Sequence, residues 1–251
     1  MDRQPTVSAG ELTAEQRSRL DEDGFLVLPD ILSADQCDVW SAAVDEVWER
    51  QRTETHGYTE EPGVRFADNL LRHSLLFEGC LREPLVLDGV RAVLGPGIKL
   101  SLLNGRRTEP GYGLQPLHDL QRERGRPFQG CTTFWCLDAF TAANGTRVIP
   151  GSHLTGDPFL ARCEDPLLPH PDETRVVARR GSVVIFNSHL IHGGSRNEAA
   201  TPRRSVQCTF TLVGNQSYYD WRKLPQEIRH GLGPESVDLL GVEPSDSVEP
   251  N

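Results

Sequence analysis

Two histidines and one aspartate are the residues whose types and spacing best suit metal chemistry. His118 stands in "QPLHDLQRE", with Asp119 directly after it, and His192 stands in "SHLIHGG", just after the apolar run "SVVIF". Two imidazoles and one carboxylate on one face make the facial triad that holds non-haem Fe(II) and leaves positions open for other ligands. We interpret His118, Asp119 and His192 as candidate metal ligands.

An arginine and a serine further along the chain have the types and spacing of an anion clamp. Arg203 and Ser205 open an apolar run, and because side chains alternate along a strand they share one face while Arg204 takes the other. A buried guanidinium beside a hydroxyl suits bidentate binding of a carboxylate. A surface ion pair would explain any arginine here equally well, but the order His192, Asn197, Arg203 favours a clamp on a strand adjacent to the metal ligand.

The elements that must position these residues begin with helices. Capping boxes, with a hydroxyl at the N-cap and Gln three residues on, start at Thr13 and Ser33 and predict two helices. Between them "GFLVLPDIL" predicts a short strand. The helix after Ser33 carries Trp40 and Trp48 on an apolar stripe, which is typical of core packing.

From about residue 97 the pattern changes to short strands. Gly, Pro and Asn separate apolar runs at 98–104, 131–140, 146–150, 174–178, 182–187 and 204–213. This pattern predicts a mainly β protein with flanking helices, built on an antiparallel jelly-roll or barrel. We expect one domain over 1–251, with a helical part at about 11–95, a β core at about 97–213 and a partly disordered segment at 214–251.

Composition excludes several classes of partner. The 251 residues carry a net charge of −10, which argues against binding nucleic acid or anionic membranes. No signal peptide or membrane-spanning run is present, and the six cysteines lack CxxC spacing, so we expect a cytoplasmic protein without disulfides. Nothing in the sequence indicates an oligomeric state. The cysteines are Cys37, Cys80, Cys131, Cys136, Cys163 and Cys208.

Three longer segments resemble a known family. "FWCLDAFTAANGTRVIPGSHL" (134–154), "RRGSVVIFNSHLIHGGSRNEAATPRRSVQCTF" (179–210) and "LTAEQRSRLDEDGFLVLPDILS" (12–33) are similar to the phytanoyl-CoA dioxygenase-like family of Fe(II)/2-oxoglutarate oxygenases. The resemblance covers about residues 11 to 213 and is weaker between 50 and 97. It implies a double-stranded β-helix (cupin-like) fold, one catalytic Fe(II) and 2-oxoglutarate as cosubstrate.

The resemblance also assigns roles to residues. His118 and His192 match the proximal and distal metal ligands, and Arg203 matches the arginine that binds the far carboxylate of 2-oxoglutarate. Ser205 fits an Arg-x-Ser arrangement of related oxygenases. Trp135 matches a strand residue beside the cosubstrate, and Thr133 points to the same face. We expect His153 to be structural. His189 has no matching ligand role, and a zinc hydrolase built on His189 and His192 would lack a nearby glutamate.

The metal motif departs from the family's pattern. The family has His-x-Asp, which puts both side chains on one side of a strand, whereas here Asp119 follows His118 directly and Leu120 takes the ligand position. Three readings stay open. A local bulge re-aims Asp119 at the metal. Alternatively, two histidines suffice, with water or halide in the third place as in halogenating relatives, although leucine is bulky. Or the protein is a non-oxygenase homologue, a regulatory partner or a redox-neutral enzyme.

The expected substrate is a small polar molecule. Hydroxylation is the default reaction implied by the resemblance, with oxidative cyclisation as a variant, in the tailoring of a natural product. Segments 56–69, 154–173 and 215–223 are expected to wall the pocket, because long loops at a barrel mouth usually carry binding. Their acids, aromatics and arginines suit a sugar-containing or amino-acid-derived substrate.

Overall fold

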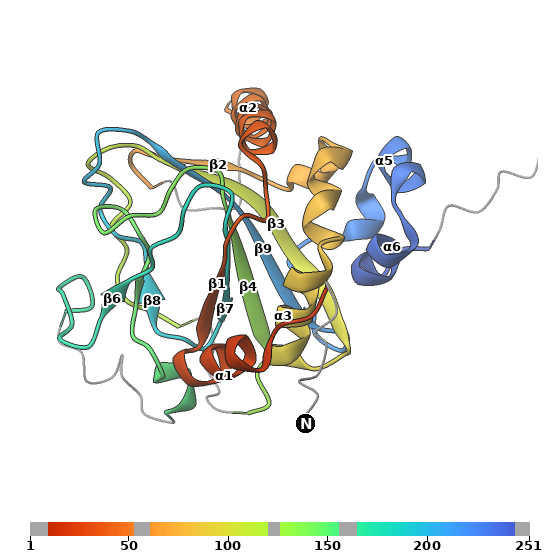
Figure 1. Ribbon diagram of the computed structural model, residues 1–251. Coiled ribbons are helices and arrows are strands. Elements are labelled where there is room, and N and C mark those ends of the chain that lie inside the picture. The colour runs from red at the N-terminus through yellow and green to blue at the C-terminus, as the bar shows by residue number, and fades with distance from the viewer. Residues whose placement is uncertain (1–9, 53–60, 120–125, 156–164, 244–251) are drawn as a thin grey trace, which may run out of the picture.

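Two antiparallel sheets form the framework of the computed structural model, which describes residues 10–52, 61–119, 126–155 and 165–243 (Figure 1). The large sheet has the strand order β1-β7-β4-β9-β3-β2, and the small sheet has the order β6-β5-β8. The large-sheet strands are β1 (Phe25–Leu28), β2 (Val64–Ala67), β3 (Ile98–Thr108), β4 (Gly130–Cys136), β7 (Val183–Asn187) and β9 (Arg203–Leu212). The small-sheet strands are β5 (Arg147–Val148), β6 (Thr174–Arg175) and β8 (His192–Gly193).

The chain passes back and forth between the two sheets. From β4 in the large sheet it runs to β5 and β6 in the small one, returns to β7, crosses to β8 and returns again to β9. This winding is that of a jelly-roll, or double-stranded β-helix, as the short apolar runs predict. The outer face of the large sheet carries helices, and its inner face meets the small sheet (Figure 1).

Three helices cover the outer face of the large sheet. They are α1 (Ala14–Asp23), α2 (Ala34–Gln51) and α3 (Pro84–Leu94). Both predicted capping boxes are confirmed, at Thr13 for α1 and at Ser33 for α2. The helices lie close to the sheet at two glycines: a Cβ on Gly105 of β3 would lie 2.6 Å from Val44 of α2, and one on Gly89 of α3 would lie 2.4 Å from Ile185 of β7, so either would force a neighbouring side chain to shift.

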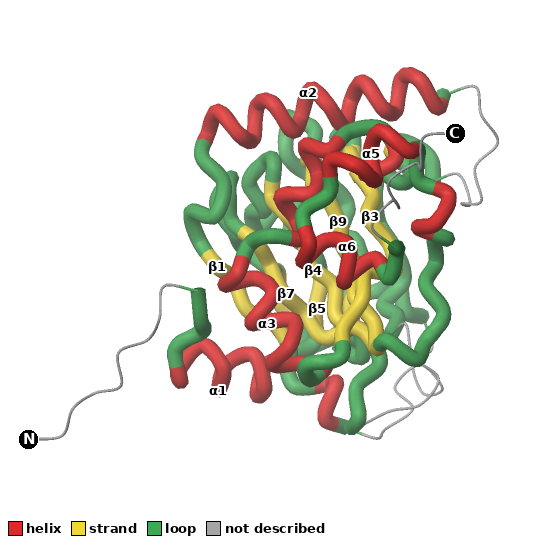
Figure 2. Tube along the Cα trace, turned by 90° about the vertical axis from the view of Figure 1, so that its right-hand side faces the viewer, coloured by secondary structure: helices red, strands yellow, loops and turns green. Residues whose placement is uncertain are grey.

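Short helices and the C-terminal segment complete the fold. Figure 2 shows α5 and α6 beside β3, on the side away from α1. The Trp221 indole N–H donates to the carbonyl of Leu100, 2.9 Å away, so the segment around Trp221 packs against β3. Residues 244–251 of the predicted disordered tail lie outside the described residues. The short helices are η1 (Leu70–Arg72), η2 (Leu75–Leu81), η3 (Ser152–Leu154), η4 (Trp221–Lys223), α5 (Gln226–Gly231) and α6 (Pro234–Leu240).

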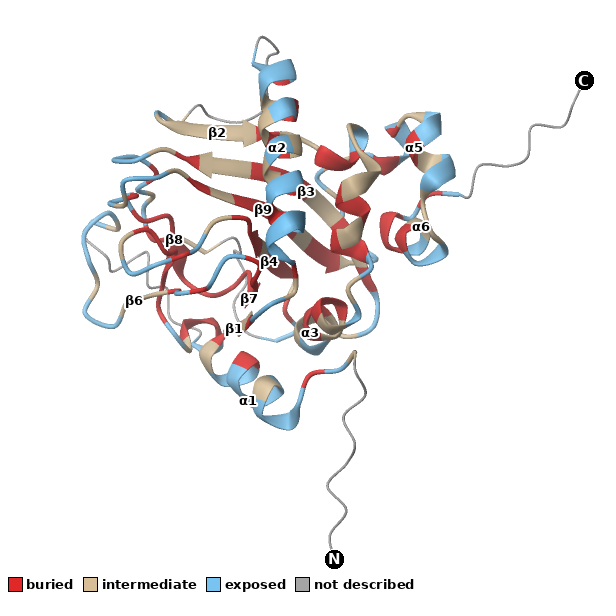
Figure 3. Ribbon diagram, turned by 45° about the horizontal axis from the view of Figure 1, so that its top comes forward, coloured by how far each residue is buried: buried red, intermediate tan, exposed pale blue. Residues whose placement is uncertain are grey.

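Strand alternation separates two apolar cores, and Figure 3 shows α2, with its exposed residues outward, in front of strands that carry many buried residues. In β4, Trp135 packs into the core between the large sheet and the helices, whereas Phe134 packs against the core between the two sheets. In β7, Ile185 packs into the core between the large sheet and the helices, and Val184 packs into the core between the two sheets. The face of each large-sheet residue therefore decides whether it can reach the space between the sheets. None of the described helices is long and apolar enough to cross a lipid bilayer.

Candidate active site

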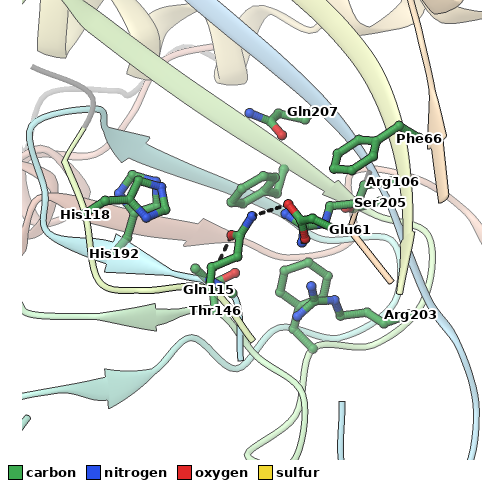
Figure 4. A pocket seen from close by; sticks show the side chains of 13 residues that line it. Glu61, Phe66, Arg106, Gln115, His118, Thr146, His192, Arg203, Ser205 and Gln207 are labelled. Carbon is green, nitrogen blue, oxygen red and sulfur yellow. Dashed lines mark hydrogen bonds and ion pairs between the residues drawn. The ribbon is translucent and has the colours of Figure 1, made fainter. Parts of the chain in front are cut away.

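A cavity of about 230 Å³ lies between the two sheets (Figure 4). It brings together His118, His192, Arg203 and Ser205, which lie far apart in sequence. Phenylalanines and polar side chains from the large sheet and from loops complete its wall. The lining residues are Glu61, Phe66, Arg106, Gln115, His118, Phe134, Phe140, Thr146, His192, Gly194, Arg203, Ser205 and Gln207.

The two histidines lie on paired backbone segments, and their imidazoles are held by the same kind of hydrogen bond. Backbone hydrogen bonds run both ways between them, His118 N to His192 O at 2.7 Å and His192 N to His118 O at 2.9 Å, and their ring centroids are 4.5 Å apart. Each Nδ1 lies 2.7 Å from the carbonyl two residues earlier, of Pro116 and of Leu190. A carbonyl only accepts, so each Nδ1 must donate, and each Nε2 keeps its lone pair for a metal.

Burial keeps the imidazole of His192 uncharged. Removal from water, and secondarily the proximity of His118, lower the pKa of His192 to about 3. A neutral imidazole is the form that ligates metals. The donor set of these two residues therefore fits a transition metal such as Fe(II).

The Gly-Gly pair after His192 explains how the histidines come so close. A Cβ on Gly193 would lie 2.9 Å from the carbonyl oxygen of Pro116, and one on Gly194 would lie 2.4 Å from that of Gly113. Both contacts are closer than a real Cβ allows. The absence of side chains lets the segment before His118 lie directly against β8.

The predicted carboxylate ligand does not lie on the cavity wall. Asp119 is half-buried and comes directly after the bridge formed by His118, but the lining residues do not include it. Among the described residues, no three His, Cys, Asp or Glu side chains form a group that would hold a metal ion. Leu120, which occupies the family's ligand position, lies outside the described residues. The role of Asp119 as a ligand stays a prediction.

Arg203 is a buried cation that faces the cavity without a carboxylate partner among the described residues. Its guanidinium donates to the carbonyl of Asn144, lies 4.7 Å above the ring centre of Phe140, and keeps an unpaired Nε–H. Burial, and secondarily the charge of Arg106, lower the pKa of Arg203 to about 9. An uncompensated buried cation is costly unless an anion joins it, so this site fits the carboxylate of a ligand.

The neighbours of Arg203 on β9 follow the predicted alternation. Ser205 is buried and lines the same cavity, as does Gln207. Arg204 points to the other face, where it pairs with Asp45 at 3.1 Å and with Asp138 at 3.1 Å. The sequence pattern therefore placed Arg203 and Ser205 together on the correct face.

The prediction that Trp135 and Thr133 lie beside the cosubstrate is wrong, because neither residue lines the cavity. The two residues do share a face, and the Trp135 indole N–H donates to the Thr133 hydroxyl at 3.2 Å. That face is the outer one, where Trp135 packs against Trp40 of α2 with 5.6 Å between ring centroids. Phe134 lines the cavity instead. The physical reason is the register of β4, which the sequence could not fix.

His189 and His153 have structural roles. His189 accepts a hydrogen bond from the backbone N–H of Gln129 at Nε2, 3.1 Å away, so it does not join His192 in a metal site. His153 lies 3.1 Å from the carbonyl of Asp21 at the end of α1, which agrees with its predicted structural part. Asn197 is fully buried and donates to the carbonyls of Thr108 and Thr201, which fixes the turn before β9.

Several cavity residues were missed by sequence reasoning. Arg106 lies opposite Ser205 in the β3–β9 register, a pairing visible only in the folded sheet. Glu61 and Gln115 come from loops. The short sequence separation between Gln115 and His118 could have indicated that Gln115 lies near the metal ligand. Of the segments expected to wall the pocket, 56–69 contributes Glu61 and Phe66. Segment 215–223 instead packs outside, on β3, and does not line this cavity.

A known family matches most of the chain. The model of the phytanoyl-CoA dioxygenase (PhyH) family matches residues 20–205. Dioxygenase trt7 of Aspergillus terreus (strain NIH 2624 / FGSC A1156) is 27% identical over 254 residues, covering 94% of this chain and 85% of that protein.

Solved structures agree with the fold. The structure of HygX from Streptomyces hygroscopicus with nickel and 2-oxoglutarate bound matches with a TM-score of 0.67 at 21% identity, covering 87% of this chain and 94% of that one. A second HygX structure also contains hygromycin B. The non-heme alpha ketoglutarate dependent carbocyclase SnoK from nogalamycin biosynthesis matches with a TM-score of 0.63 at 22% identity, covering 80% and 84%.

The double-stranded β-helix prediction is thus confirmed by these neighbours, and the family prediction by the match over residues 20–205. The chain belongs to the phytanoyl-CoA dioxygenase family, whose members are Fe(II)- and 2-oxoglutarate-dependent dioxygenases.

Proposed function

We propose that this protein is an oxygenase that hydroxylates or oxidatively cyclises a small polar molecule during the tailoring of a natural product. The observation that carries the proposal is that His118 and His192, with both Nε2 atoms directed away from their carbonyl partners, share one cavity with Arg203, a cation that no carboxylate of the described residues neutralises. The HygX and SnoK structures, one with hygromycin B bound and one of a nogalamycin enzyme, support the natural-product assignment.

In this proposal His118, His192 and Asp119 hold Fe(II). Asp119 is the carboxylate nearest in sequence to His118, and metal binding would have to draw it toward the histidines because it is not on the cavity wall. When bound, iron and 2-oxoglutarate supply the oxidising power for attack on a substrate C–H bond.

The chain's own residues bind the cosubstrate, orient the metal ligands and exclude water. Arg203 holds the far carboxylate of 2-oxoglutarate through a charge-assisted hydrogen bond, and Ser205 adds a hydroxyl on the same face. Phe134 and Phe140 form an apolar wall that keeps water away from the reacting centre. The carbonyls of Pro116 and Leu190 hold the two imidazoles in one tautomer and orientation.

Anaerobic titration with Fe(II) and 2-oxoglutarate tests the proposal. We expect the weak visible charge-transfer band of an iron–2-oxoglutarate chelate, and we expect Asp119→Ala to weaken it while Leu120→Ala leaves it unchanged. A band that Asp119→Ala leaves unchanged would mean that two histidines suffice, and chloride should then be tested as the third ligand. The absence of any band would remove the oxygenase proposal.

A further inference from the structure

A chain of polar side chains crosses the cavity away from the histidines (Figure 4). Gln115 accepts from the backbone N–H of Gly194 at 3.0 Å and donates from Nε2 to Glu61 Oε1 at 2.7 Å. The other oxygen of Glu61 accepts from Arg106 Nη2 at 2.7 Å. All four residues line the cavity, so these hydrogen-bonded side chains connect Gly194, just after the end of β8, to β3 in the opposite sheet.

The hydrogen bonds determine which atoms of these side chains can bind a ligand. A backbone N–H only donates, so the amide oxygen of Gln115 faces Gly194 and its nitrogen faces Glu61. The carboxylate of Glu61 has lone pairs beyond the two bonds that it accepts. Arg106 has a buried Nε–H that no described group accepts. Acceptors and an unused donor therefore lie side by side.

The charges within this row of hydrogen-bonded side chains cancel. The pair of Glu61 and Arg106 is largely buried, with side chains 30% and 12% exposed, and carries no net charge. Arg203 differs because no described carboxylate neutralises it. An anionic group would gain from Arg203 but would be repelled by Glu61. A hydroxyl both donates and accepts, so two adjacent hydroxyls match a carboxylate and a guanidinium without a charge mismatch.

An aromatic ring stands beside the pair. The guanidinium of Arg106 lies 5.3 Å from the ring centre of Phe66, which also lines the cavity. An aromatic ring on the cavity wall next to charged hydrogen-bonding groups suits a ligand ring with C–H bonds on its faces and hydroxyls at its edge. The whole cavity, with a volume of about 230 Å³, is below the roughly 300–1,000 Å³ of sites for drug-sized ligands and also has to admit the proposed cosubstrate, which favours a small substrate over a long acyl chain.

We infer that Glu61, Arg106, Gln115 and Phe66 form the substrate subsite, and that it takes an uncharged, polyhydroxylated six-membered ring. The inference rests on the proposed function, since it names the substrate class of the same cavity. Glu61 is its specificity-determining residue, because it both accepts from a hydroxyl and neutralises Arg106.

Ligand-observed NMR on the full chain tests the subsite. The protein is loaded with Zn(II), which is diamagnetic and redox-inert, and with 2-oxoglutarate. The probes are myo-inositol and cyclohexanol, which share a six-carbon ring but carry many hydroxyls or one. We expect saturation transfer to myo-inositol and at least fivefold weaker binding of cyclohexanol.

Variants locate the binding. Glu61→Gln should weaken myo-inositol binding about tenfold, because a charge-assisted hydrogen bond becomes a neutral one. Glu235→Gln is the matched control, since Glu235 pairs with Arg91 at 3.2 Å on the exposed surface, and it should bind the probe as the parent chain does. Equal binding of both probes, no binding of myo-inositol, or unchanged binding in Glu61→Gln would overturn the subsite.

The two proposals fail separately. A charge-transfer band with Fe(II) and 2-oxoglutarate, together with no binding of myo-inositol, would leave the oxygenase proposal standing and remove the subsite. Binding of myo-inositol that depends on Glu61, together with no band, would keep the subsite and remove the oxygenase proposal.

Discussion

At the scale of single residues, the site combines two imidazoles with one buried cation that has no carboxylate partner among the described residues. His118 and His192 are held by backbone carbonyls, so their orientation does not depend on a metal. Arg203 is held by the carbonyl of Asn144 and by the face of Phe140, with no described carboxylate to neutralise it. These residues are arranged for ligands that bring negative charge into the cavity.

Replacement of Arg203 tests this arrangement. We expect Arg203→Gln to weaken 2-oxoglutarate binding by roughly 10- to 100-fold, because a hydrogen bond to a charged group contributes about 1.5–3 kcal/mol. Arg204→Gln is the control, since Arg204 faces away and pairs with Asp45 and Asp138. Calorimetric titration of both variants with metal and 2-oxoglutarate measures the effect. Equal loss in the two variants would show that Arg203 is not the carboxylate anchor.

At the scale of elements, the site depends on one close approach between a loop and a strand. Gly193 and Gly194 let the segment before His118 lie against β8, and Gln115 ties it there through its backbone and its side chain. The metal ligands thus come from two segments whose spacing is set by glycine. This contact explains why glycines stand at positions 193 and 194.

A methyl group at Gly194 should disturb the metal site. We expect Gly194→Ala to cost roughly 1–3 kcal/mol of unfolding free energy, since its Cβ would lie 2.4 Å from the Gly113 carbonyl oxygen. It should also weaken Fe(II) binding about tenfold, because the histidines would move apart. Chemical denaturation and metal titration measure both effects. Gly214→Ala, whose Cβ would meet nothing within 4 Å, should change neither, and unchanged Fe(II) affinity in Gly194→Ala would contradict the argument.

At the scale of the whole molecule, the proposed ligands would connect the two sheets. Arg203 belongs to β9 in the large sheet and His192 to β8 in the small one, with the cavity between them. A cosubstrate bound to both would stabilise the folded chain, because it binds only when the sheets are assembled. The predicted single domain implies that the sheets unfold together.

Differential scanning calorimetry checks this picture. We expect one unfolding transition, and an increase of roughly 5–10 °C in its midpoint when metal and 2-oxoglutarate are present at about a hundred times their dissociation constants. A chelator should abolish most of the increase. Two separate transitions would contradict the single domain, and an unchanged midpoint would contradict joint binding across the sheets.

The sequence by itself determined the family, the order of most elements and part of the site. Local signals were sufficient for these features: the capping boxes at Thr13 and Ser33 depend on residues three positions apart. The alternation that puts Arg203 and Ser205 on one face depends only on their spacing within one strand. Helix α3 and strand β2 lie in the region where the resemblance was weak, and were not predicted.

Only the tertiary structure decided which strand faces look into the cavity and which loops reach it. Phe134 rather than Trp135 lines the wall because the register of β4 in the sheet sets which face is inner, and a single strand carries no record of that register. The meeting of Glu61, Arg106 and Gln115 likewise depends on long-range contacts. Residues distant in sequence become neighbours only when the packing of two sheets fixes their separation.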